Sequence, residues 1–92
     1  MNEIEILESK LRLALQQIDS LPRDSGIDPE HLRFVRVNLT AYLKQVEDRP
    51  ESILSSDLSC VSRLVIEYWP LSLPAGEAVI AAEEAMKKFV EK

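Results

Sequence analysis

Two residue types that enzymes often use for acid–base or nucleophilic chemistry occur once each in the chain, as His31 and Cys60. A histidine acting as general base needs a nucleophile or an orienting carboxylate, and no motif in the sequence supplies one. A reactive cysteine needs a helix N-terminus or a cationic neighbour, and only Arg63 lies at helical spacing with the right charge. We therefore interpret His31 as a surface or capping residue and Cys60 as a small buried hydrophobic residue.

The sequence also lacks the spacing of known cofactor sites. One histidine, one cysteine and scattered carboxylates form neither C-x-x-C nor H-x-x-x-H, the spacings that bind metals. Glu83 and Glu84 are adjacent in sequence, so they project from different faces of a helix. With two glycines in the chain, a glycine-rich phosphate loop cannot form. We predict that the protein has no cofactor or metal and is not an enzyme.

Ser56-Asp57-Leu58 resembles the attachment site of acyl carrier proteins, which are also small, acidic and four-helical. In that family the serine stands in the order Asp-Ser-Leu, and a long loop occupies the region where this chain has a regular helical pattern. A carrier with phosphopantetheine on Ser56 or Ser59 is therefore a minor alternative.

The composition is that of one globular domain covering residues 1–92. Hydrophobic residues make up 46% of the chain and aromatic residues 5%, so the core must be largely aliphatic. The net charge is −5, whereas nucleic-acid binding needs a concentrated basic surface. The charge favours a basic protein partner over a nucleic acid.

Three features predict a cytoplasmic protein without a membrane span. No segment approaches the roughly 20 apolar residues that cross a bilayer. The N-terminal residues 1–5 are acidic where a signal peptide is basic, and a single cysteine excludes an intramolecular disulfide.

Proline spacing predicts the fold. All five prolines lie between stretches of helical periodicity, and none lies inside one; they are Pro22, Pro29, Pro50, Pro70 and Pro74. Because proline costs about 3 kcal/mol in a helix interior, these positions divide the chain into four helical segments. Short connections make neighbouring helices antiparallel, so we predict an all-α, antiparallel up-down four-helix bundle.

Each segment has an apolar stripe at alternating spacings of three and four residues. The four stripes are Ile4, Leu7, Leu11, Ala14, Ile18 and Leu21; Leu32, Val35, Leu39, Tyr42 and Val46; Leu54, Leu58, Val61, Val65 and Tyr68; and Val79, Ala82, Met86 and Phe89. The second segment has a further stripe of Phe34, Val37 and Ala41, which predicts a helix enclosed on most sides.

Prolines and capping residues predict the helix boundaries. Asp28 and Pro29 mark the start of the second helix as N-cap and first helical residue. Ser72 can cap the fourth helix, with Pro74 in its first turn. The third helix has two candidate starts: a capping box of Asp48 and Glu51, or a later start capped by Ser55 or Ser56. It should end at Trp69, before Pro70.

The candidate binding residues are an apolar cluster and a small basic arc. Tyr68, Trp69 and Leu71 form the cluster, in which Trp69 either contacts a partner or seals one end of the core. Arg33 and Arg36 lie with Lys44 on the polar arc of the second helix, as an anion-binding patch or as a solvated face.

The order of helices resembles the small immunity proteins that protect producers of pediocin-like bacteriocins, which are cytoplasmic antiparallel four-helix bundles of about this length. The similarity runs from Glu8 onward. It includes residues 31–44 (HLRFVRVNLTAYLK), 61–66 (VSRLVI) and the leucine-rich connector into the last helix. The resemblance implies a fold and an immunity function, but no residue roles. Many members of the family are basic, whereas this chain is acidic.

Two hypotheses for function follow. In the first, the protein is a non-catalytic immunity or inhibitor protein that covers its partner with the apolar end around Tyr68, Trp69 and Leu71, steered by acidic charge. In the second, it is a structural module that forms a homodimer through surplus apolar residues. These are Ile6 with Leu13, or Phe34 with Val37 and Ala41.

Overall fold

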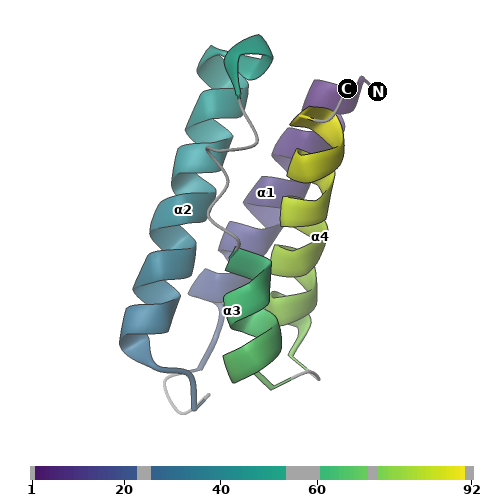
Figure 1. The fold of residues 1–92 in the computed structure, drawn as a ribbon. Coiled ribbons are helices and arrows are strands. Elements are labelled where there is room, and N and C mark those ends of the chain that lie inside the picture. Colours follow the sequence, from purple (N-terminus) through teal and green to yellow (C-terminus); the bar gives the residue numbers. More distant parts are fainter. Residues whose placement is uncertain (1, 23–25, 54–60, 71–72, 91–92) are drawn as a thin grey trace.

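The computed structural model describes residues 2–22, 26–53, 61–70 and 73–90. They form the α-helices α1 (Glu3–Asp19), α2 (Pro29–Asp48), α3 (Val61–Tyr68) and α4 (Pro74–Val90), and a short 3₁₀ helix, η1 (Pro50–Ser52). Successive α-helices run in opposite directions, with α3 beside one half of the bundle (Figure 1). The predicted all-α four-helix bundle is confirmed.

The helices begin where local chemistry satisfies their free backbone N–H groups. The side chain of Asn2 accepts a hydrogen bond from the backbone N–H of Glu5 at 2.8 Å. Asp28 accepts one from the N–H of Glu30 at 2.9 Å, with Pro29 as the first residue of α2. Pro74 likewise begins α4, whereas the predicted cap Ser72 lies outside the described residues. The start of α2 is confirmed, and so is the place of Pro74 in the first turn of α4.

The region after α2 corrects one of the two starts predicted for the third helix. Asp48 is the last residue of α2, and η1 has no side-chain cap, so Asp48 and Glu51 do not form a capping box. The described part of α3 begins at Val61, and Ser55 and Ser56 lie outside the described residues. The predicted end is confirmed, because α3 stops at Tyr68, directly before Trp69 and Pro70.

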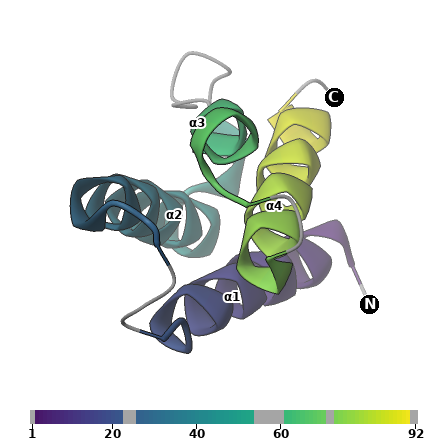
Figure 2. The same cartoon turned by 90° about the horizontal axis from the view of Figure 1, so that it is seen from below.

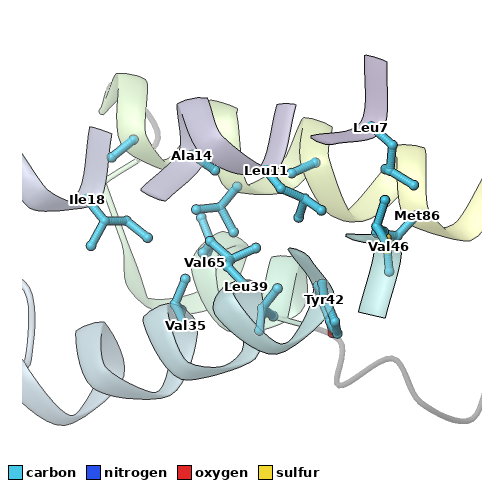
Figure 3. Close-up of a cluster of buried hydrophobic side chains, with 14 of the residues drawn as sticks. Leu7, Leu11, Ala14, Ile18, Val35, Leu39, Tyr42, Val46, Val65 and Met86 are labelled. Carbon is cyan, nitrogen blue, oxygen red and sulfur yellow. The ribbon is translucent and has the colours of Figure 1, made fainter. Parts of the chain in front are cut away.

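The core lies along the axis of the bundle, where the stripes of α1, α2 and α4 meet α3 (Figure 3). Side chains from all four helices converge there, and most are aliphatic, as the composition predicts. The buried members of the predicted stripes are Leu7, Leu11, Ala14, Ile18, Val35, Leu39, Tyr42, Val46, Val61, Val65, Val79, Ala82 and Met86. The end view shows α1 between α2 and α4, with α3 beside α4 (Figure 2).

The surroundings of α2 differ from the prediction. Phe34, Val37 and Ala41 are exposed, with Val37 at 59% of its full accessible area. The prediction of a helix enclosed on most sides is therefore wrong. The reason is the number of neighbours: α2 packs against α1 and, less extensively, against α3 and η1. Two flanking helices cover one stripe of α2 and leave the second stripe open.

The buried face of α3 also differs at its end. Tyr68, predicted in the apolar stripe, is 65% exposed, while Trp69 is 4% exposed and belongs to the core. The buried line therefore runs through Val61, Val65 and Trp69, at spacings of four. This line faces Gly76 of α4, where an added Cβ would lie 3.1 Å from Cγ1 of Val65. The missing side chain at Gly76 allows α3 to approach α4 closely.

Candidate interaction surface

The predicted site residues do not form one surface. Tyr68 is exposed at the end of α3, whereas Trp69 is buried, which agrees with sealing of the core end. Arg33 is exposed on α2. Arg36 forms an ion pair with Asp19 of α1, with 2.7 Å between Nη2 and Oδ1. Leu71 lies outside the described residues.

A ring contact nevertheless links α2 and α3 at Tyr68. The rings of His31 and Tyr68 are in contact, with 5.0 Å between their centroids and 50° between their planes. Phe34 follows His31 by one helical turn, and Val37 follows Phe34 by another, so these residues are neighbours on α2. We name His31, Phe34, Val37 and Tyr68 the α2–α3 patch. Sequence analysis had placed Phe34 and Val37 in a second stripe without linking them to Tyr68.

The chemistry available to His31 is limited by its neighbours. Its Nε2 lies 4.0 Å from Oδ2 of Asp28, and the other oxygen of Asp28 caps α2. Its ring contacts Tyr68, and the side chain is about one-third exposed. These contacts agree with the predicted surface role beside the helix cap. Cys60, Ser56 and Ser59 lie outside the described residues.

A shallow groove of about 220 Å³ runs between the first half of α1 and the second half of α4. Its apolar wall includes the side chains of Ile6, Leu7, Ala81, Ala85 and Phe89, and its charged residues are Glu3, Lys10, Glu84 and Lys88. We name this hollow the α1–α4 groove. Leu13, one heptad after Ile6 on α1, is also exposed.

A buried carboxylate that the sequence analysis missed links three of the helices. Glu83 of α4 is fully buried. Its Oε2 accepts hydrogen bonds from the hydroxyl of Tyr42 (3.0 Å) and the backbone N–H of Val61 (2.8 Å). Its Oε1 accepts from the backbone N–H (3.1 Å) and the hydroxyl (2.6 Å) of Ser62. The carboxylate therefore acts as the cap of α3, supplied by a different helix.

The sequence contains a signal for this burial. Glu83 lies four residues after Val79 and three before Met86, so it falls on the same face of α4 as those core residues. A charged residue at such a position is normally paired or hydrogen-bonded. Since donors from Tyr42, Val61 and Ser62 already occupy both oxygens, the geometry assigns Glu83 a structural role.

Searches for metal sites and membrane spans gave no candidates within the described ranges. No group of three or more metal-binding side chains comes together in them. None of their helices combines the length and apolar character that a bilayer span needs.

Comparison with known proteins adds no relative. No protein-family model, no curated protein and no solved structure matches the chain. The resemblance to bacteriocin immunity proteins therefore stays a prediction.

Proposed function

We propose that this protein is a non-catalytic binding module that covers a surface of another protein, as immunity and inhibitor proteins do. The observation that carries the proposal is the α2–α3 patch. Phe34, Val37 and Tyr68 are large side chains of aromatic or aliphatic character, and all three are exposed. Tyrosine is enriched at the energetic centres of protein interfaces, and contiguous exposed apolar surface commonly marks an interaction site.

The surroundings of the patch support a protein partner. Arg33 is exposed one helical turn before Val37, and Asp28 and Glu30 lie next to His31 at the start of α2. An apolar centre with charged residues around it is the arrangement common in protein interfaces. The chain as a whole carries a net charge of −5, which favours association with a basic partner at low ionic strength.

Val37 is the aliphatic residue of the patch and is exposed, so the role of the patch can be tested by substitution there. Val37 of the patch and Ile66 of α3 are both aliphatic and are 59% and 55% exposed. Val37→Glu and Ile66→Glu are therefore a matched pair, one inside the patch and one outside. Tagged wild type and both variants are used for pull-down from the source cells at low salt, and circular dichroism checks folding.

We expect wild type and Ile66→Glu to recover the same partner in stoichiometric amount. Val37→Glu should weaken that complex by more than tenfold, or about 1.4 kcal/mol, because it buries a charge in an apolar contact. Two results count against the proposal: no stoichiometric partner at low salt, or equal recovery by both variants.

The immunity form of the proposal makes a narrower claim. It rests on the similar order of helices and on the four-helix fold. The gene should lie beside one for a small bacteriocin or toxin, and expression of wild type should protect sensitive cells. Protection that persists with Val37→Glu would place the recognition surface elsewhere.

A further inference from the structure

We infer that the α1–α4 groove binds the same groove of a second copy of this chain, forming a two-fold symmetric homodimer. This inference does not depend on the proposed function, because the groove is formed by α1 and α4, whereas the patch lies on α2 and α3, the other two helices of the bundle (Figure 2). The surface, the occupant and the test all differ between the two proposals.

The charge of the groove suits a second copy. The chain carries a net charge of −5, so two copies repel each other over most of their surface. The groove is an exception, because its charged residues are two acids and two lysines: Glu3, Glu84, Lys10 and Lys88. This local balance allows two acidic molecules to meet here without a repulsive contact.

The side-chain sizes are also self-complementary. On α1, Ile6 and Leu13 are exposed and large; on α4, the groove is lined by the small residues Ala81 and Ala85. A two-fold axis parallel to the groove places α1 of one copy over α4 of the other. Large residues of each copy then face alanines of its partner, and small residues allow helices to approach closely.

The same symmetry pairs opposite charges. α1 and α4 run in opposite directions (Figure 1), and the groove is lined by Lys10 as its last residue on α1 and by Ala81 and Glu84 as its first residues on α4. Lys10 and Glu84 therefore lie within about one helical turn of each other along the bundle. With α1 over the partner's α4, Lys10 of each copy faces Glu84 of the other. None of the ion pairs among the described residues includes Lys10 or Glu84, which leaves both available for the second copy.

The face is large enough for a reversible dimer. At about 1.5 Å per residue, the 17 residues of α1 and of α4 give a face about 25 Å long. Two adjacent helices make it about 18 Å wide. A face of this size, with Ile6 and Leu13 of each copy as its large apolar residues, corresponds to the smaller class of specific interfaces. We therefore expect dissociation in the micromolar range.

The test is sedimentation velocity of the full chain from low micromolar to high micromolar concentration. We expect wild type to be monomeric at the low end and dimeric at the high end. Lys10→Glu and Glu84→Lys should each weaken the dimer by about tenfold or more. In the dimer of either variant, both contacts between residues 10 and 84 join like charges. Circular dichroism confirms that each variant is folded.

The decisive sample is an equimolar mixture of Lys10→Glu and Glu84→Lys. In a mixed dimer every facing pair is again of opposite charge, so the mixture should dimerise where neither variant does alone. If a substitution acted only by disturbing the fold of its own chain, mixing the two variants would not restore dimerisation. Ile6→Glu should abolish the dimer, and Val37→Glu in the α2–α3 patch should leave it intact.

Three results would overturn the inference. They are a wild type that stays monomeric at high micromolar concentration, a dimer that withstands Ile6→Glu, and a mixture that remains monomeric while both variants are folded.

Discussion

Glu83 occupies a core position of α4 with a side chain that ordinarily avoids the core. Removing a carboxylate from water is costly unless hydrogen bonds replace its hydration, and here four donors do so. Two of them are backbone N–H groups at the described start of α3, where the helix dipole favours negative charge. None of the ion pairs among the described residues includes Glu83, so polar donors alone stabilise the charge.

This geometry predicts a large effect of the smallest possible change, Glu83→Gln. A glutamine amide has one oxygen and one NH₂ group. In either orientation the NH₂ group faces a backbone N–H, that of Val61 or that of Ser62, so two donors are in contact. We expect the free energy of unfolding to fall by about 3 kcal/mol, as for loss of hydrogen bonds to a buried charged group. Urea unfolding at dilute concentration, followed by circular dichroism, measures the change.

The neighbouring residue provides the control for this prediction. Glu84 is exposed, so Glu84→Gln makes the same chemical change without removing a buried acceptor. It should alter the free energy of unfolding by no more than about 0.5 kcal/mol. Equal effects of the two substitutions would show that the network around Glu83 does not stabilise the fold.

At the scale of the elements, α3 depends most on its neighbours. Its described part has eight residues, and isolated helices shorter than about 12 residues are marginal in water. Its stability must come from the cap supplied by Glu83, from burial of Val65 and Trp69, and from close packing on Gly76. We therefore expect α3 to open more readily than the three longer helices.

Gly76→Val tests this dependence. A Cβ at residue 76 already lies 3.1 Å from Cγ1 of Val65, and valine adds two methyl groups beyond it. Overpacking of this kind costs about 1–3 kcal/mol, and α3 should lose its packing first. Hydrogen exchange should accelerate most in α3. In contrast, Ala41→Val, at an exposed position of α2, should cost about 0.5 kcal/mol through helix propensity alone. Uniform acceleration in all four helices would contradict the prediction.

The elements also show what the sequence could predict. The start of α2 and the place of Pro74 in the first turn of α4 depend on local residues such as Asp28, Pro29 and Pro74, and these two predictions are confirmed. The exposure of Val37 depends on how many helices surround α2, which no local pattern contains. The burial of Trp69 in place of Tyr68 depends on the packing of α3 against Gly76 of α4. Glu83 was detectable as a charge within an apolar stripe, but its donors come from segments 21 to 41 residues away.

At the scale of the whole molecule, the two candidate interfaces lie on different helices of a bundle measuring 39 × 25 × 19 Å. The residues that line the α1–α4 groove include none of the α2–α3 patch, so a dimer formed there does not use the patch residues. Two identical binding surfaces in one assembly increase the retention of a partner presented in several copies. If both proposals hold, self-association and partner binding use different residues and do not compete.

The stoichiometry of the partner complex tests this arrangement. If both proposals hold, wild type at a concentration that favours the dimer should form an assembly containing two copies of each protein. Ile6→Glu, which removes the dimer but not the α2–α3 patch, should form a complex with one copy of each. Light scattering coupled to size-exclusion chromatography gives both masses.

A wild-type complex with one copy of each would mean that the partner displaces the second copy and binds the α1–α4 groove itself. In that case the acidic and basic residues of the groove recognise the partner, and Lys10→Glu should weaken partner binding where Val37→Glu does not.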